Sequence, residues 1–451
     1  MSKSKQKREK ERKKQQAHQT PDAGRRKLIM IGVGGAGALA VAGFAGYKAG
    51  WFGSDEMVKQ PVAAPAYKAL PVVTLSPTAE NALKVADDYV SHYARELKDP
   101  SAVSHAMISF GKKFTLNDGS NVVDFLSKFA RENEVNGKKY VYFPHEIEVH
   151  ENSFLAGFLE CNVSPEQQII AGSTRYTLRD LMEASKALFR CDPQNLQKYD
   201  PMFLFRHLPW GLMAFSMMIK PQESVWTNAY GEKIDLNLVI ESGLDAFERS
   251  CAGTSADIRR GEPESLFFRQ EMNKYACFGM HMVYGFFACL RFGYKGNNLS
   301  KRTNDLFDNV ILRMEGDPAA IDRESDLAAQ FGQEYLNRIG AGEDGKSATK
   351  GKPPALTIEV MRLRHRIRAL GHALENINYV RLHNLFSITP DQARRIEAGE
   401  KLLYSDLVKL AAIDMAPFLY WHPKFVSDAV ISVSHSSRAM KLLLPNNPDL
   451  A

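Results

Sequence analysis

The segment Leu28–Tyr47, LIMIGVGGAGALAVAGFAGY, has twenty residues and no charged side chain. Gly32, Gly34 and Gly37 follow the strand-like LIMI with the spacing G-x-G-x-x-G, which is typical of a dinucleotide-binding turn. That fold also needs a helix, a second strand and an acidic residue about 20 positions later. The nearest acid, Asp55, follows no second strand. Twenty helical residues at about 1.5 Å each span the roughly 30 Å hydrocarbon core of a bilayer, so the segment predicts a membrane helix.

The flanking charges predict the orientation of this helix. Residues 1–27 contain eleven Lys or Arg and three acidic residues. Because cytoplasmic flanks carry an excess of Lys and Arg, we expect a cytoplasmic N-terminus, a single pass through the cytoplasmic membrane and a periplasmic or extracellular domain. Arg25 and Arg26 partly match a twin-arginine signal, so both Sec and Tat export stay open, as does cleavage near residues 63–66.

The same tail accounts for the basic character of the chain. The full sequence carries a net charge of +6, whereas residues 1–27 alone carry +8. The remaining 424 residues hold 47 basic and 49 acidic side chains, a net charge of −2. We expect residues 28–47 to have the lipid bilayer as their partner. The domain beyond them has no excess of positive charge, so we do not expect it to bind nucleic acid.

The sequence predicts four segments: a basic tail at 1–27, the membrane helix at 28–47, a Pro-containing tether at 48–77 and a helical domain at 78–451. Within the domain, a Gly- and Lys-rich stretch at 340–355 predicts a flexible loop. Thr177 and Thr389 have the form of helix starts, because an acid or amide follows three residues later. Only Lys138–Phe143 has the alternating pattern of a strand. About a dozen amphipathic runs therefore predict an all-α domain, either toroid-like or irregular.

Three histidines recur in similar helical surroundings: SHAM at 104–107, MHMV at 280–283 and GHAL at 371–374. With the number of helices, this recurrence resembles exported bacterial proteins of the α/α-toroid superfold, which terpenoid cyclases and prenyltransferases use. The resemblance covers roughly residues 78–450. It implies inner helices that present His105, His281 and His372 to a central cavity. The Asp-rich motifs of the cyclases are absent from the sequence, and a fold does not by itself transfer a function.

Two pairs of residues are candidates for chemistry. Cys277 and His281 are four apart on a predicted helix, the spacing of two zinc ligands, but the sequence names no third ligand other than Cys251 by elimination. His372 and Glu375 share a helical face, where the carboxylate would orient the imidazole for general-base work. In each case a buried core residue is the competing interpretation. We therefore predict no cofactor, with zinc as the alternative, and list His105, His281, His372 and Glu375 as catalytic candidates.

Aromatic loops supply the candidates for ligand binding: Trp210, Trp226, Asn228 and Tyr230, which are residue types that stack on and orient sugars or small ligands. The five cysteines are too few for a disulfide scaffold, although one bridge is allowed. Two functions stay open. The first is a binding or scaffold domain of the cell envelope with a glycan or protein partner. The second is an envelope enzyme that acts on a glycan or lipid-linked substrate through cavity His and Glu residues.

Overall fold

The computed structural model describes residues 74–260, 272–331, 350 and 352–444. The chain divides into two compact units, Met1–Ala69 and Leu70–Ala451. The predicted tail, membrane helix and most of the tether lie outside the described residues, as does most of the predicted loop at 340–355. None of the helices in the described ranges combines the length and the apolar character needed to cross a bilayer.

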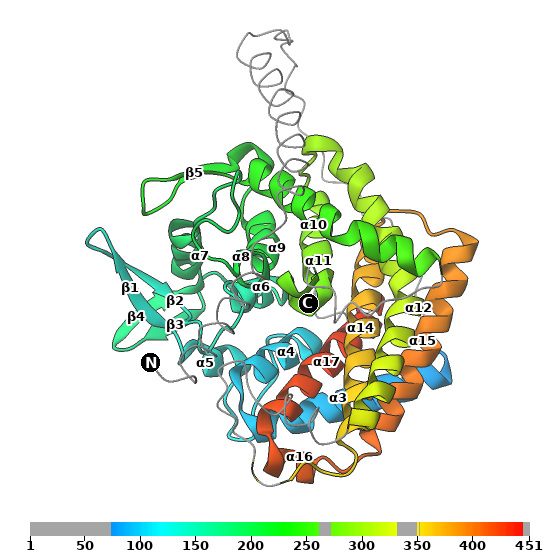
Figure 1. Cartoon of the computed structure of the whole chain (residues 1–451). Helices are drawn as coiled ribbons and strands as arrows, with labels where there is room; N and C mark the ends of the chain where they lie inside the picture. Colours follow the sequence, from blue (N-terminus) through cyan, green and yellow to red (C-terminus); the bar gives the residue numbers. More distant parts are fainter. Residues whose placement is uncertain (1–73, 261–271, 332–349, 351, 445–451) are drawn as a thin grey trace, which may run out of the picture. The chain divides into compact units, whose positions relative to one another are not determined.

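The second unit is mostly helical, which confirms the predicted all-α class (Figure 1). Its main helices are α3 (Pro77–Leu97), α4 (Pro100–Phe110), α5 (Val122–Ser127), α6 (Ser153–Glu160), α7 (Leu178–Leu188), α8 (Phe203–Arg206), α9 (Leu208–Met218), α10 (Leu236–Arg259), α11 (Met280–Arg291), α12 (Leu299–Phe331), α14 (Thr357–Leu382), α15 (Pro390–Ala411), α16 (Ala416–Trp421) and α17 (Pro423–Lys441). Short 3₁₀ turns lie at Pro221–Glu223, Met272–Lys274, Ala276–Gly279 and Gly296–Asn298.

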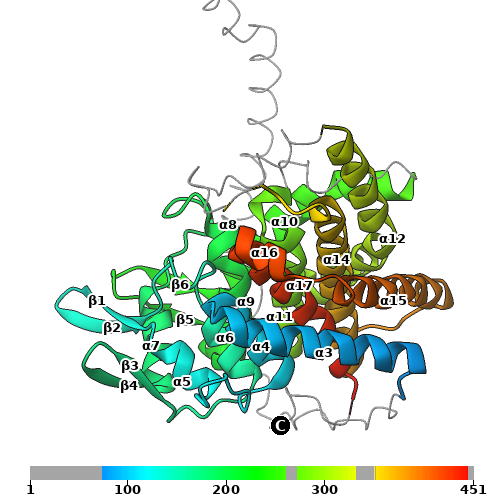
Figure 2. The same cartoon turned by 90° about the horizontal axis from the view of Figure 1, so that it is seen from below.

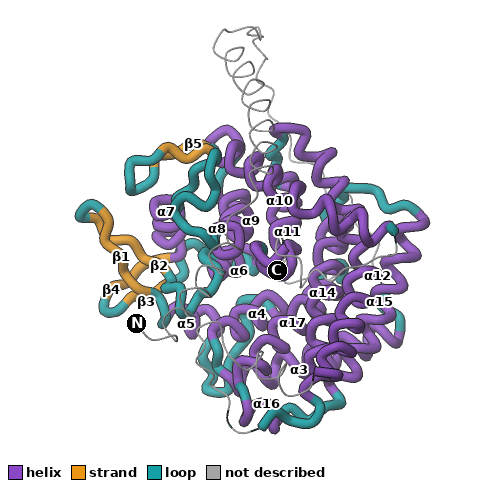
Figure 3. The backbone as a smooth tube through the Cα atoms, viewed as in Figure 1, coloured by secondary structure: helices purple, strands orange, loops and turns teal. Residues whose placement is uncertain are grey.

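Three antiparallel hairpins accompany the helices: β1 (Arg131–Val135) with β2 (Lys138–Tyr142), β3 (Gln168–Ala171) with β4 (Thr174–Thr177), and β5 (Val225–Thr227) with β6 (Lys233–Asp235). They gather on the side of the molecule that carries α7 (Figure 3). Only β2 falls within the predicted strand. The others escaped prediction because they are three to five residues long and largely polar or exposed, so they carry little apolar alternation.

Local signals set several helix ends as predicted. The Thr177 side chain accepts from the backbone N–H of Asp180, while the Asp180 carboxylate accepts from the backbone N–H of Thr177. Thr389 and Gln392 form the same reciprocal pair at the start of α15. Each pair satisfies backbone donors that a helix start leaves without partners.

Three helical runs that the sequence predicts differ in the structure. The runs near 299–315 and 320–338 predict two helices, but their described residues belong to one helix, α12, which continues through Pro318. Contacts with α14, α15 and α10 stabilise α12 across the hydrogen bond that proline removes. In the described part of the run predicted at 265–292, which starts at residue 272, the α-helix begins at Met280, because Cys277, Phe278 and Gly279 have left-handed backbone angles.

Six helices pack on one another in a succession that returns to its start. α4 packs on α6, α6 on α9, α9 on α11, α11 on α14, α14 on α17, and α17 again on α4. These ring helices surround the middle of the view in Figure 1. α3, α12 and α15 lie outside them: α3 packs on α17, α4 and α15, while α12 packs on α14 and α15 (Figure 2). The buried core of the unit is continuous across these contacts.

The contact between α14 and α17 is the closest in the ring, and it depends on a glycine. A Cβ added at Gly371 would lie 3.1 Å from the backbone nitrogen of Ser436 and closer still to its Oγ. A Cβ in a real structure rarely approaches another atom that closely, so only glycine lets the two backbones meet here. His372 follows Gly371 and His435 precedes Ser436, so these two side chains are in close contact, with 3.8 Å between their ring centroids.

A half-buried histidine, His207, also connects α9 to the preceding loops. His207 donates to Asp200 Oδ2 at 2.7 Å through Nε2 and to Glu151 through Nδ1. Burial lowers the pKa of His207, but Glu151 and Asp200 outweigh burial and raise this pKa above its ordinary value. The protonated imidazole is therefore the form that stabilises the fold.

We expect Gly371→Ala to lower the free energy of unfolding by about 1–3 kcal/mol, because the added methyl group overpacks the contact with Ser436. Gly296→Ala is the matched control, since a Cβ at that position meets no atom within 4 Å. Urea titrations of both variants measure the difference. Equal stability of the two variants would contradict the close approach of α14 and α17.

We expect the cost of His207→Gln to depend on pH. Below about pH 6.5 the cationic imidazole contributes its full stabilisation, which is lost as pH rises through the raised pKa of His207. The difference in unfolding free energy between variant and parent should therefore be larger at about pH 6 than at about pH 9. His92→Gln, on the exposed side of α3, is the control and should show no such trend.

Candidate functional site

A small cavity of about 30 Å³ lies among the six ring helices. Every ring helix contributes to its wall. The lining residues are Ser104, His105 and Ile108 from α4, Ser153, Ala156, Gly157 and Glu160 from α6, Trp210 and Met213 from α9, His281 and Tyr284 from α11, Glu375 from α14, and His435 and Arg438 from α17. A cavity of this volume has room for about one water molecule.

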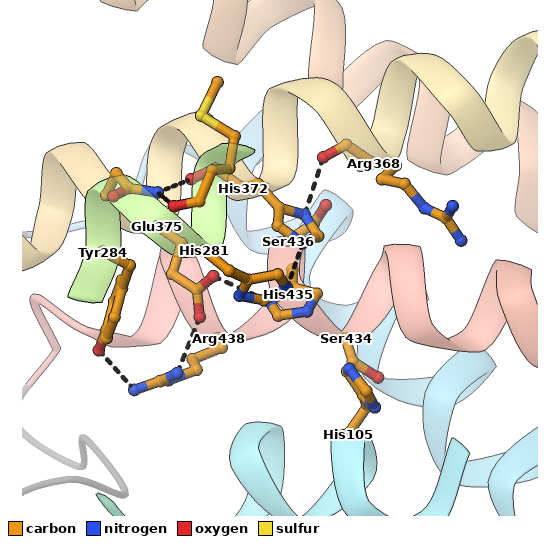
Figure 4. Close-up of polar contacts among 12 residues, drawn as sticks. His105, His281, Tyr284, Arg368, His372, Glu375, Ser434, His435, Ser436 and Arg438 are labelled. Carbon is orange, nitrogen blue, oxygen red and sulfur yellow. Dashed lines mark hydrogen bonds and ion pairs between the residues drawn. The ribbon is translucent and has the colours of Figure 1, made fainter. Parts of the chain in front are cut away.

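Four imidazoles lie together at this cavity, three of them in its wall (Figure 4). His372 Nε2 lies 3.1 Å from His281 Nε2. The His435 ring centroid is 3.8 Å from that of His372, 5.1 Å from that of His281 and 5.1 Å from that of His105. The structure therefore brings together all three predicted histidines around a fourth, His435. His372 stands behind the others and does not itself line the cavity.

The hydrogen-bond partners fix how these rings are protonated. Nδ1 of His105 donates to the Ser101 carbonyl at 2.6 Å, and Nδ1 of His372 donates to the Arg368 carbonyl at 2.9 Å. Nδ1 of His435 donates to Glu375 Oε2 at 2.8 Å. Since each neutral ring carries one proton, Nε2 of each of these rings is left with a lone pair. Nε2 of His435 is buried and has no hydrogen-bond partner among the described residues.

A buried charge network adjoins the imidazoles. Arg438 donates to Glu375 Oε1 and to Glu160 Oε1, both at 2.9 Å, and to the Tyr284 hydroxyl at 2.9 Å. The side chains of Arg438 and Glu375 are each 3% exposed. Glu375 thus pairs with His435 and Arg438 across the helix contact. The predicted partner, His372 on the same helix, faces the Arg368 carbonyl instead.

Burial determines the protonation states. It lowers the pKa of His105 to about 4 and holds those of His281, His372 and His435 well below the ordinary value, and neighbouring imidazoles and Arg368 lower them further. Burial also raises the pKa of Glu375 to about 7, although Arg438 lowers it. The centre is therefore a set of neutral imidazoles beside one carboxyl group that titrates near neutrality.

Cys277 also belongs to this centre, although its backbone does not adopt the predicted α-helix. It lies outside α11, with φ 47° and ψ 45°, and Phe278 follows with φ 55° and ψ 35°. Two successive non-glycine residues in the left-handed region cost about 1–2 kcal/mol each, and such strain clusters at functional sites. This turn places Cys277 Sγ and one nitrogen each of His281 and His372 within 4.8 Å of one another. The third potential donor of this group is thus His372, which the sequence did not suggest, and Cys251 is not a member of the group.

The predicted ligand-binding residues separate into two places. Trp210 lines the cavity and packs against two imidazoles, stacked on His150 at 4.0 Å and tilted relative to His281 at 4.6 Å, and it is buried. Trp226, Asn228 and Tyr230 lie instead in the β5–β6 hairpin, outside the cavity wall.

Each of these three side chains contacts the turn of the hairpin or residues 186–190. Trp226 Nε1 donates to the Lys186 carbonyl at 2.9 Å. The Asn228 amide donates to Phe189 and Glu232 and accepts from backbone N–H groups of the turn. The Arg190 guanidinium lies 4.5 Å from the Tyr230 ring centroid. The hairpin therefore uses these side chains to hold its own turn.

Sequence reasoning missed His435, Arg438 and Glu160. The first two lie in SVSHSSRAM, 432–440, where His435 and Arg438 are three residues apart among buried serines. Here small residues surround a His and an Arg on the helix α17. Such a pattern predicts a helix face that packs closely on a neighbour and also carries charge, and it could have been read from the sequence. Glu160 ends an apolar run and carried no comparable signal. None of the five cysteines, all within the described ranges, forms a disulfide.

No protein-family model, curated protein or solved structure matches this chain.

We expect Arg438→Met to lower the free energy of unfolding by about 3–5 kcal/mol, because it leaves the buried Glu375 and Glu160 carboxylates without their counter-charge. Adding Glu375→Gln should recover part of this loss. Arg394→Met is the control: its pair with Asp391 is 71% and 58% exposed and should contribute less than about 1 kcal/mol. A small effect of Arg438→Met in urea titration would contradict the buried network.

Proposed function

We propose that this chain is a membrane-anchored, exported enzyme with an α/α-toroid domain, and that its active site is the cavity bounded by His105, His281, Glu375 and His435. The observation that carries the proposal is the convergence of four imidazoles, Glu375 and Arg438 on one cavity from separate helices. Their sequence positions span 334 residues, from 105 to 438. Packing alone gives no reason to collect so many buried polar groups at one point.

The toroid proposal is supported by the order of the ring helices. In the succession α4, α6, α9, α11, α14, α17, each helix packs on the next and the last packs on the first. Residues of all six helices line the cavity at the centre of this ring: α9 contributes Trp210 and Met213, and the other five contribute polar or charged side chains. A fold of this kind does not define the reaction, so the chemistry has to come from the residues at the centre.

His435 and Glu375 have the arrangement of a general base and the group that orients it. Glu375 accepts from Nδ1 at 2.8 Å, and the lone pair of Nε2 is buried at the cavity. In hydrolysis, Nε2 would take a proton from a water molecule as the water oxygen attacks the substrate, and then return that proton to the leaving oxygen. Arg438 and the Tyr284 hydroxyl, 2.9 Å apart, would stabilise negative charge that develops on the substrate.

A glycan or lipid-linked substrate is the class we propose, in keeping with the predicted address in the envelope. Glycosidic bonds are cleaved by pairs of carboxyl groups, and Glu160 and Glu375 lie on the same cavity, bridged by Arg438. The present cavity has room for about one water, so a sugar ring would have to move the ring helices apart on binding. Trp210 cannot serve as a stacking platform while it is buried against His150 and His281.

A scaffold role is the competing function. A scaffold needs an accessible surface, and it gains nothing from an unpartnered Nε2 at a buried cavity. This cost is the reason to prefer the enzyme.

To test the proposal, the full-length chain in detergent would be given chromogenic 4-nitrophenyl glycosides and esters and a polyprenyl-linked disaccharide. We expect turnover of a glycosidic or lipid-linked substrate. His435→Gln and Glu375→Gln should each lower kcat/KM by about 10²–10⁴-fold, the usual contribution of a positioned acid or base. His92→Gln, at the exposed position on α3, should leave kcat/KM unchanged.

Folded protein that turns over none of these classes would reject the enzyme and favour the scaffold, whereas full activity in both cavity variants would reject this cavity as the active site. Circular dichroism and melting temperature of each variant separate loss of chemistry from loss of fold.

A further inference from the structure

Cys277, His281 and His372 present three potential ligand atoms to one point. The thiol sulfur and one nitrogen from each ring lie within 4.8 Å of one another. His281 and His372 are 6% and 1% exposed, so the two ring nitrogens are shielded from bulk solvent, whereas Cys277 is half-buried. Thiolate and imidazole are the donors that zinc prefers, whereas magnesium and calcium prefer oxygen.

The distance between the two Nε2 atoms fits a shared metal ion. Two nitrogens bound to zinc at about 2.0–2.1 Å in tetrahedral geometry stand about 3.3 Å apart. In the structure they are 3.1 Å apart. A hydrogen bond from His281 to His372 also fits this distance, so the separation alone does not decide between the two accounts.

The surroundings of His372 favour the metal. Its Nδ1 donates to the Arg368 carbonyl at 2.9 Å, which leaves the Nε2 lone pair directed at His281. Histidine ligands almost always donate their second nitrogen to a carbonyl or carboxylate in this way, which fixes the tautomer and the ring orientation.

The position of Cys277 is independently constrained. Arg313 Nη1, on α12, donates to the Phe278 carbonyl at 2.9 Å. Arg313 is held in turn by Asp317 at 3.0 Å, and both side chains are almost fully buried. A buried ion pair on a neighbouring helix thus holds the left-handed turn that directs Cys277 toward the two rings. If α11 instead extended as a regular helix over residues 277–279, these residues would not need the contact with Arg313.

We propose that Cys277, His281 and His372 form a binding site for one zinc-class transition-metal ion. Three protein ligands leave a fourth position for water, as in catalytic zinc sites. His281 also lines the cavity, so the metal would stand beside the site proposed for catalysis. The inference goes beyond the proposed function and does not depend on it, because a metal can bind here whether or not the chain turns over a substrate.

The test is metal analysis of the full-length chain, purified without chelators and incubated with equimolar Zn²⁺. We expect about one zinc per chain. X-ray absorption should give a first shell with nitrogen at about 2.0–2.1 Å and one sulfur at about 2.3 Å. Replacement by Co²⁺ should give the visible bands of a tetrahedral site, with a sulfur charge-transfer band that Cys277→Ser abolishes.

Matched variants assign the ligands. His372→Gln and Cys277→Ser should each weaken zinc binding by more than the roughly 10–100-fold that loss of a supporting residue costs. His92→Gln and Cys191→Ser should bind zinc as the parent does, because neither residue belongs to the three-residue group.

Three results would overturn the site. They are a parent protein that takes up neither Zn²⁺ nor Co²⁺, a first shell without sulfur, and retention of metal by both ligand variants. The first two concern the parent alone, so they hold even where a variant does not fold. Turnover of a glycan by a parent that takes up neither Zn²⁺ nor Co²⁺ would uphold the enzyme and reject the metal site, whereas a bound metal without turnover would do the reverse.

Discussion

The close contact between α14 and α17 at Gly371 and Ser436 is the constraint on which the rest of the site depends. It brings His372 against His435 and lets Glu375 reach both His435 and Arg438 across the helix interface. Burying charged and polar groups in this way is unfavourable unless each finds a partner at short range. A separation even slightly larger would weaken the bonds from Glu375 to the facing helix and leave its carboxylate poorly compensated. The ring of six helices is thus stable only in an arrangement that also assembles the polar centre.

Much of the fold was predictable because it follows from local signals. The apolar periodicity of α3, α15 and α17 and the reciprocal caps at Thr177 and Thr389 lie within short stretches of sequence. The failures occurred where tertiary contacts override local preference. α12 continues through Pro318 because neighbouring helices support it, and the turn at Cys277–Gly279 is left-handed in a segment whose apolar pattern favours a helix. No local rule predicts either, since the cause lies on another part of the chain.

The site was predictable in its residue types and unpredictable in its pairings. His105, His281, His372 and Glu375 were all identified from their helical surroundings, and all four belong to the centre. The partner assigned to Glu375 was wrong, because spacing along one helix favours His372, whereas the carboxylate crosses to His435 and Arg438 on α17. Trp226, Asn228 and Tyr230 had a suitable composition for ligand binding, yet the polar side-chain atoms of Trp226 and Asn228 bond the hairpin turn and residues 186–189, and the Tyr230 ring lies against Arg190. Composition identifies candidates, and only the packing of distant helices selects among them.

The polar centre also costs the fold stability, and this cost bears on its chemistry. Burial keeps its imidazoles neutral, which suits a base or a metal ligand but gives no net stabilisation to the fold. The left-handed turn at Cys277 adds strain, and the buried Arg313–Asp317 pair is needed to hold it. Apolar side chains of similar volume would fill the same space with less cost. Several independent features that lower stability therefore occur around His281. This residue belongs both to the cavity and to the group around Cys277. Such a coincidence is expected where a protein gives up stability to hold reactive groups in place, and it is not expected of a core that only fills space.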